Sequence, residues 1–355
     1  MPMPYSLRFP VAQDTTPTPR GRADVQIHGK FDAGDGDMKV FFNPKMSTES
    51  FGFSPSAAKP AKAVADWISR GLDIEIVDFE PATEADLCLA HDPKFVRDVL
   101  TLKINNGHGN RIKSVTDSCL WTVGSTVAAS GQALIDGIAC SPSSGFHHAH
   151  HASNRGYCTF NGMVVAAEKL RAEGRIKKAG IIDCDAHYGD GTDDIIDRLE
   201  LHNHIKHWTF GGVFDHGTFS QDVLLKELKQ ALDTMKSDGV ELILFQAGGD
   251  VHVLDPLGGW MESDEIRERD RFVFQTCHEM KLPIAISLAG GYQRDAEGKI
   301  DAVLALHRAT IEEALKVFGE SSTSPKRRSR IRDTTMENLG KSIAIIGGVR
   351  SPPKD

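Results

Sequence analysis

The sequence has 355 residues, a formal net charge of −8 and 40% hydrophobic residues, as expected for a globular protein of one or two domains. The negative charge argues against broad nucleic-acid binding, and no apolar run reaches the roughly 18–20 residues that a membrane-spanning helix needs. The N-terminus lacks the apolar segment of a secretory signal and the six cysteines are scattered, so we expect free thiols and a cytoplasmic protein.

Strand-like and helix-like segments alternate along most of the chain. Residues 1–36 have no periodicity and predict an N-terminal extension or arm. The predicted strands are 38–44, 73–79, 180–186, 204–210, 241–247 and 282–289, and the predicted helices are 57–71, 93–104, 111–137, 161–174, 220–239, 263–281 and 300–319. This alternation predicts a single α/β domain over 37–320, with a mostly parallel sheet and helices on both faces.

The last part of the chain, residues 321–355, is predicted to form a C-terminal extension. Its basic segment 326–332 is interpreted as solvated and mobile, with a localisation or docking patch as the alternative. The apolar segment 340–350 is a candidate edge strand.

Acidic and imidazole side chains follow two of the predicted strands, where functional residues of parallel sheets gather. Asp183, Asp185 and His187 alternate along an extended segment, so any two of them can face one ion. Asp250 follows another strand behind two glycines and is the natural third ligand. Three protein ligands with open positions are typical of catalytic zinc, and so many buried carboxylates without a cation are costly.

Four histidines lie within the segment GFHHAHHAS, at positions 147, 148, 150 and 151. A hydrolytic metal site needs a base for its water and an electrophile for the substrate carbonyl. The histidine run can supply the base, but its spacing alone does not say which histidine acts. Tyr292, which follows the tight turn allowed by Gly290 and Gly291, is the candidate electrophile.

Six motifs occur in a fixed order: AHDPKFV (90–96), GFHHA (145–149), GYCTFN (156–161), DCDAHYGDG (183–191), GGDVHVLDPLG (248–258) and AGGY (289–292). In this order and spacing, the chain resembles the histone deacetylase superfamily, which includes acetylpolyamine amidohydrolases and acetoin-utilisation proteins. The resemblance covers roughly residues 38–320. It implies an arginase-like fold, a parallel sheet with helices on both faces, and the chemistry of a metal-dependent amide hydrolase.

The resemblance implies that Asp185, His187 and Asp250 bind a catalytic Zn²⁺, with Fe²⁺ as an alternative. It also implies a structural K⁺ on backbone carbonyls around residues 183–187. The family commonly has a second histidine where this chain has Tyr188. Because that position is not a ligand position, metal binding is expected to survive the change.

The resemblance also separates the histidines into two pairs. In the family, a Gly-aromatic-Cys segment ends about ten residues after the second dyad histidine, which is the separation of His148 and Cys158 here. His147 and His148 are therefore the expected dyad. His150 and His151 are expected on the loop surface near the pocket mouth.

The implied roles follow the same motifs. His148 is the expected general base, and it would later protonate the leaving amine, while His147 is an electrostatic partner. Asp183 and Asp190 are expected to hydrogen-bond to His147 and His148, respectively. Tyr292 is the expected donor to the developing oxyanion.

The expected substrate-binding residues are less well fixed by the motifs. Tyr157 occupies the position of a phenylalanine that lines the acyl-lysine channel in the family, and the opposite wall is expected to be Phe214 or Asp215. Leu257 stands where some polyamine-specific members have a glutamate, which argues against a polyamine substrate without excluding it. Gly290 completes this predicted set.

The first functional hypothesis is a hydrolase that removes acetyl or other acyl groups from lysine side chains of proteins, by metal-activated water. The alternative is a deacetylase of acetylated polyamines or other small acylated amines. A binuclear manganese ureohydrolase is disfavoured because the chain offers few bridging carboxylates, and an inactive relative because every catalytic position is kept. A homo-oligomer is compatible with these readings, whereas nucleic-acid and membrane partners are not expected.

Overall fold

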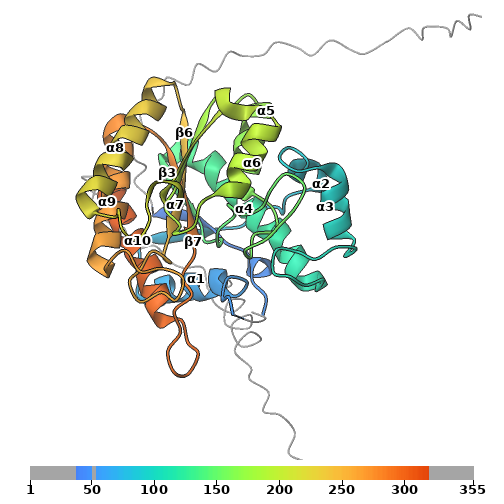
Figure 1. The fold of residues 1–355 in the computed structure, drawn as a ribbon, viewed down its shortest axis with the longest axis horizontal. Coiled ribbons are helices and arrows are strands. Elements are labelled where there is room, and N and C mark those ends of the chain that lie inside the picture. The colour runs from blue at the N-terminus through green and yellow to red at the C-terminus, as the bar shows by residue number, and fades with distance from the viewer. Residues whose placement is uncertain (1–36, 50–52, 320–355) are drawn as a thin grey trace, which may run out of the picture. The chain divides into compact units, whose positions relative to one another are not determined.

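The computed structural model describes residues 37–49 and 53–319 (Figure 1). The two predicted extensions, 1–36 and 321–355, lie outside the described residues. The basic segment 326–332 and the candidate edge strand 340–350 lie outside them as well.

Seven strands form one sheet in the order β2-β1-β3-β7-β6-β4-β5, and every described pairing is parallel. The strands are β1 (Met38–Phe41), β2 (Ile74–Val77), β3 (Ile138–Ser141), β4 (Ala179–Asp183), β5 (Ile205–Thr209), β6 (Leu242–Gly248) and β7 (Ile284–Ala289). The prediction of an α/β fold with a mostly parallel sheet is confirmed.

Helices cover both faces of the sheet (Figure 1). One face packs against α1 (Lys59–Ser69), α8 (Gln221–Ser237), α9 (Ser263–Met280) and α10 (Asp301–Gly319); the other packs against α3 (Pro93–Leu100), α4 (Lys113–Asp136), α5 (Gly162–Ala172) and α6 (Asp190–Arg198). Short helices α2 (Glu84–Leu87) and α7 (Phe210–Val213) complete the set, with 3₁₀ turns at Pro44–Met46 and Leu201–Asn203. None of the helices in the described ranges is long and apolar enough to cross a membrane.

The central strands end in a row of polar residues. β4, β6 and β7 are buried along their whole length, which explains their nearly continuous apolar sequences. Near their carboxyl ends, strand pairing places five polar side chains side by side across the sheet: Ser141, Ser287, Gln246, Asp183 and Thr209. We call these five residues the polar row; it lies directly beneath the loops that carry the candidate site.

Four described elements were missing from the predicted alternation: the short helices α2 and α7, and two elements that bear on the site, β3 and α6. β3 has only four residues and its last residue, Ser141, is followed by Pro142, so its apolar signal was too short to separate from a loop. α6 begins at Asp190, and its sequence DGTDDIIDR is rich in residues that also favour turns. α6 matters for the site because its first residue is one of the predicted catalytic carboxylates.

Candidate active site

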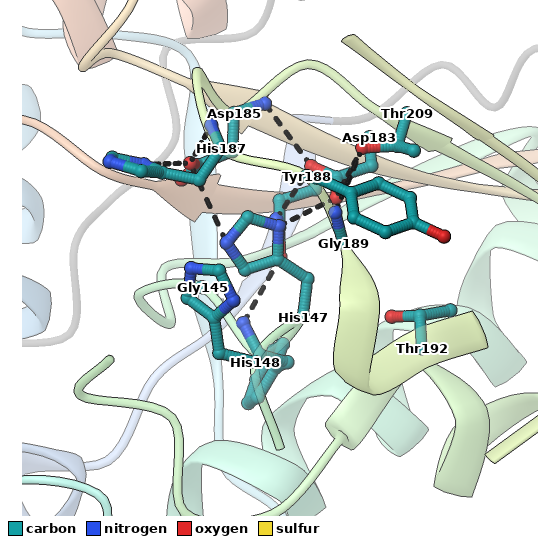
Figure 2. A network of polar contacts seen from close by, with 12 residues as sticks. Gly145, His147, His148, Asp183, Asp185, His187, Tyr188, Gly189, Thr192 and Thr209 are labelled. Carbon is teal, nitrogen blue, oxygen red and sulfur yellow. Dashed lines mark hydrogen bonds and ion pairs between the residues drawn. The ribbon is translucent and has the colours of Figure 1, made fainter. Parts of the chain in front are cut away.

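The predicted catalytic and metal-binding residues lie at the carboxyl ends of four adjacent strands, in the order β3, β7, β6 and β4. The histidine pair follows β3, Tyr292 follows β7, Asp250 follows β6, and the DCDAH segment spans the end of β4 and the loop after it. Residues from four distant parts of the sequence are therefore brought together by the strand order. Figure 2 shows the polar contacts that connect several of them.

Asp185, His187 and Asp250 each offer one ligand atom, and these atoms all lie within 4.8 Å of one another. The Nδ1 atom of His187 is 3.0 Å from an oxygen of each carboxylate. Both carboxylates are buried, whereas the His187 side chain is 36% exposed. This open side is where a substrate can approach.

The charges of this cluster fit a divalent cation. Burial and the charge of Asp185 raise the pKa of Asp250 to about 7, and hydrogen bonds to both carboxylates raise the pKa of His187 to about 10. Burial opposes ionisation of Asp185, yet the charge of His147 and a hydrogen bond from His187 hold its pKa below the usual range. Two carboxylates and an imidazole are donors that zinc binds, and a cation would offset the repulsion between the carboxylates.

Replacing Asp250 by asparagine is expected to weaken zinc binding by more than about a hundredfold, since even outer-shell partners account for up to that factor. The measurement is a calorimetric titration of the metal-free protein with zinc. Asp194→Asn is the matched control, because Asp194 lies on α6 and contacts Arg198 and the His151 backbone. Equal zinc affinity in the two variants would remove Asp250 from the proposed ligand set.

His147 is held at both ring nitrogens by carboxylates. Its Nδ1 donates to Asp183 at 2.7 Å, as expected, and its Nε2 lies 3.5 Å from Asp185. Burial alone would lower the pKa of His147, but the charges of Asp183 and Asp185 raise it to about 9. With a side chain only 3% exposed, His147 is an electrostatic element between the metal ligands and the polar row.

His148 is bound to a carboxylate through one of its ring nitrogens. Its Nδ1 donates to Asp190 at 2.6 Å, which is the second expected contact. Its Nε2 has no hydrogen-bond partner within residues 37–49 and 53–319, and its side chain is 17% exposed. Burial and the positive charge of His147 lower the pKa of His148 to about 3, so the ring is neutral and Nε2 can accept a proton.

The other two histidines are more deeply engaged than the sequence suggested. Both are half-buried rather than on the loop surface. The Nδ1 of His150 donates to the backbone oxygen of His148, and its Nε2 lies 3.5 Å from Asp190, to which Arg155 is also paired. His151 donates from Nδ1 to the backbone oxygen of Ala90. His150 therefore contacts the backbone of His148 and its partner Asp190, whereas His151 connects the histidine loop to the Ala90 backbone.

Tyr292 follows a turn in which Gly290 and Gly291 have φ values of 52° and 87°. A side chain at Gly290 would collide with the Asp250 side chain, so only glycine brings this turn against the metal ligands. The Tyr292 backbone donates to Asp255 at 2.6 Å. Burial and the nearby charges of Asp185 and Asp250 raise the pKa of Tyr292 well above its usual value, so the phenol stays protonated and can donate.

Aromatic rings surround Tyr292. The Phe53 ring stacks on it at 5.7 Å between centroids, and Tyr157 faces it at 6.1 Å. Tyr157 is thus placed beside the candidate catalytic residues, whereas Phe214 is not. Phe214 is 7% exposed and packs against Phe210 in the core, so the expectation that it lines a channel is corrected.

The other expected substrate-binding residues lie in surface turns. Asp215 is exposed, and its carboxylate accepts from the backbone of Gly217. Leu257 is 40% exposed and its backbone donates to Asp255, the partner of Tyr292. Both are at the surface, and Leu257 is connected to the tyrosine turn through Asp255.

Three buried polar residues that support the site were not predicted. Gln246 of the polar row donates to Asp183 at 2.7 Å and accepts from the Phe146 backbone, and a polar residue inside an apolar strand was the available signal. Lys59 is fully buried and donates to the backbone oxygen of Gly290. His91 bridges the His150 backbone oxygen and the Asn161 backbone N–H.

The sequence of this chain is similar to a protein-family model and to several known proteins. A family model described as "Histone deacetylase domain" matches residues 55–214. An uncharacterised protein of Picosynechococcus is 29% identical over 244 residues, which cover 62% of this chain and 80% of that protein. Histone deacetylase 2 of Arabidopsis thaliana is 28% identical over 190 residues, 49% of each chain. This chain therefore matches only about half the length of that plant relative.

Two solved structures share the fold. Acetylpolyamine aminohydrolase from Burkholderia pseudomallei has a TM-score of 0.60 at 18% identity, covering 79% of this chain and 99% of that one. The HD domain of HDA15 has a TM-score of 0.65 at 18% identity, covering 88% of this chain and 94% of that one. At this identity the likeness establishes the architecture, and the residues of the site carry the functional argument.

Proposed function

Because the chain belongs to the histone deacetylase superfamily, we propose that it is a metal-dependent hydrolase that removes acetyl groups from lysine side chains of proteins. Zn²⁺ is the proposed metal, with Fe²⁺ as the alternative. A structural K⁺ on the backbone carbonyls around residues 183–187, a homo-oligomeric state and a cytoplasmic location stay predictions.

One observation carries the proposal: three groups with complementary chemistry meet at one edge of the sheet. The cluster of Asp185, His187 and Asp250 can hold a cation. Beside it, the Nε2 atom of His148 has no hydrogen-bond partner among the described residues, and Tyr292 has a protonated hydroxyl. A metal site, a base and an oxyanion donor together are the parts that hydrolysis of an amide requires.

A divalent cation bound to this cluster would polarise the substrate carbonyl and acidify a water molecule. His148 then takes the proton of the attacking water at Nε2, while its Nδ1 proton stays hydrogen-bonded to Asp190. The same nitrogen returns the proton to the leaving amine. His147, fixed by Asp183, keeps positive charge beside the reacting atoms.

The Tyr292 hydroxyl donates a hydrogen bond to the carbonyl oxygen as negative charge develops there. Its ring is buried and contacts the rings of Phe53 and Tyr157, which favours one orientation of the hydroxyl. These two aromatic side chains also offer apolar surface to the methylene chain of an acylated lysine.

Acetylated polyamines are the second candidate substrates. The fold shared with an acetylpolyamine aminohydrolase favours them, and the exposed carboxylate of Asp215 offers a negative charge to a cationic substrate. The apolar, exposed Leu257 gives no charge to a second amine of the substrate. An acetyl-lysine side chain within a peptide needs no such charge, and we therefore place protein substrates first.

Removal of the metal and a comparison of substrates test the proposal together. Activity on an acetyl-lysine peptide is expected to disappear with a chelator and to return with zinc or ferrous ion. Turnover of the peptide is expected to exceed that of acetylputrescine by more than about tenfold in kcat/KM. The reverse preference would select the small-amine function, and activity unaffected by metal removal would exclude a metal-dependent hydrolase.

A further inference from the structure

The Asp183 carboxylate lies between two histidine rings. Its Oδ2 accepts from His147 at 2.7 Å, and the Nε2 of His207 lies 3.9 Å from the same oxygen. Its Oδ1 accepts from Gln246 at 2.7 Å. The proposed mechanism uses His147 and leaves His207 without a role, although both rings face one carboxylate.

His207 is a buried ring between two carboxylates. It lies on β5 with a side chain 3% exposed, and its Nδ1 is 2.7 Å from Asp193. In the part of the chain that the structure describes, its buried Nε2 has no hydrogen-bond partner and is directed at Asp183. An imidazole can donate toward both carboxylates only as the imidazolium ion. Burial opposes that form, but Asp183 and Asp193 together raise the pKa of His207.

The contacts that run from Asp183 through His207 to Asp193 end at a surface tyrosine. The Tyr188 hydroxyl donates to the second oxygen of Asp193, and Tyr188 is 46% exposed. In Figure 2 the rings of His187 and Tyr188 point in opposite directions. Tyr188 therefore extends the contacts of His207 and Asp193 and is not one of the proposed metal ligands. Tyr188 is also the position at which the chain departs from the second histidine common in the family.

Gly189 allows His207 and Asp183 to approach each other. A side chain at this position would lie 2.7 Å from the Asp183 Oδ2 and 2.9 Å from the His207 Cε1. Neither neighbour can move away freely, because Asp183 is bound to His147 and His207 is bound to Asp193. The close approach is therefore built into the loop between β4 and α6.

We propose that His207 is a positioning residue that fixes the Asp183 carboxylate and, through it, the His147 ring, and that Asp193 and Tyr188 fix His207 in turn. A buried ring whose Nε2 faces Oδ2, and whose Nδ1 is held by Asp193, limits the rotation of a carboxylate that also holds His147. His207 itself touches neither the substrate nor the reacting atoms. The kinetic consequence rests on the proposed function, whereas the structural consequence for His147 does not.

Three variants and one control test this inference. His207→Phe keeps a ring but removes both nitrogens, His207→Gln keeps one donor, and Tyr188→Phe removes only the surface hydroxyl. The matched control is His202→Gln, because His202 is an exposed histidine just before β5 that pairs with Asp197. Tyr188 and His202 are at the surface, so those two variants are expected to fold like the parent protein.

In kinetics on an acetyl-lysine peptide, His207→Phe is expected to lower kcat by about tenfold to a hundredfold, the range for outer-shell partners, and to leave KM unchanged. His207→Gln is expected to restore part of that loss, and Tyr188→Phe to show a smaller loss in the same direction. The control keeps parent values. Equal kcat in His207→Phe and the control would overturn the inference, as would a change confined to KM.

Proton NMR of the metal-free protein gives a readout that is independent of turnover. The Nδ1 proton of His147, assigned by its loss in His147→Phe, is expected at low field because it is bonded to a carboxylate. We expect this resonance to shift in His207→Phe and in Tyr188→Phe, and to stay in place in the control. An unchanged resonance in both variants would overturn the inference even if the parent protein proved inactive on every acylated amine.

Discussion

Replacing His148 by alanine is expected to lower kcat by about two to four orders of magnitude, the usual contribution of a general acid–base residue. The metal content is expected to stay at the parent level, because His148 is not among the three clustered ligands. The reason lies in its hydrogen bonding: Asp190 orients the ring through Nδ1, and no residue that the structure describes occupies Nε2, which can therefore take the proton. Steady-state kinetics and elemental analysis of the same sample measure both quantities.

His151→Ala is the matched control within the same histidine run. The His151 side chain bonds to the Ala90 backbone oxygen, away from the Asp190 contact of His148. A small loss of stability with nearly parent kcat is therefore expected. His150 is unsuitable as a control because it lies 3.5 Å from Asp190. If His148→Ala kept its turnover, or lost its metal, the role of His148 as the base would have to be given up.

Tyr292→Phe is expected to lower kcat by about a hundredfold to a thousandfold, or about 3–4 kcal/mol, as for removal of one oxyanion donor. The ring itself is kept between Phe53 and Tyr157, and the backbone contact with Asp255 is unaffected. The melting temperature and the metal content are therefore expected to stay close to parent values. Comparison of kcat with KM on an acetyl-lysine peptide separates lost transition-state stabilisation from lost substrate binding.

Tyr157→Phe provides the control for Tyr292→Phe. Both changes remove one phenol oxygen from neighbouring rings, and the contacts described for Tyr157 involve its ring and backbone. Nearly parent kcat is expected for Tyr157→Phe. Equal losses of kcat in the two variants would mean that removing either phenol oxygen has the same effect on turnover. Tyr292 would then have no special role in the reaction.

The sequence predicted the architecture because buried parallel strands give an unambiguous pattern. β4, β6 and β7 are apolar along almost their whole length and end in polar residues, so both the strands and the edge that carries function were predictable. β3 and α6 were missed because a strand of four residues and a helix rich in aspartate carry weak local signals. Their places were set by the neighbouring strands and not by local propensity.

Prediction of the site was limited by distance along the chain. The spacing of Asp183, Asp185 and His187 was readable, since these residues share one segment. No local pattern indicated that Lys59 would reach the Gly290 carbonyl, because the two are 231 residues apart. Phe214 shows the opposite error: motif order placed it near a channel, but its neighbours Phe210 and Phe219 draw it into the core.

The polar row has two opposing effects on the stability of the sheet. Its five residues occupy positions at which aliphatic side chains would bury more apolar surface. The carboxyl edge of the sheet therefore gains less hydrophobic stabilisation than an all-aliphatic edge would. Gln246 holds both Asp183 and the Phe146 backbone, and an aliphatic residue there would leave these partners unsatisfied. The row therefore holds the ends of the strands and the loops above them in place through polar contacts, and stabilising substitutions for this protein are best placed on the outer helices.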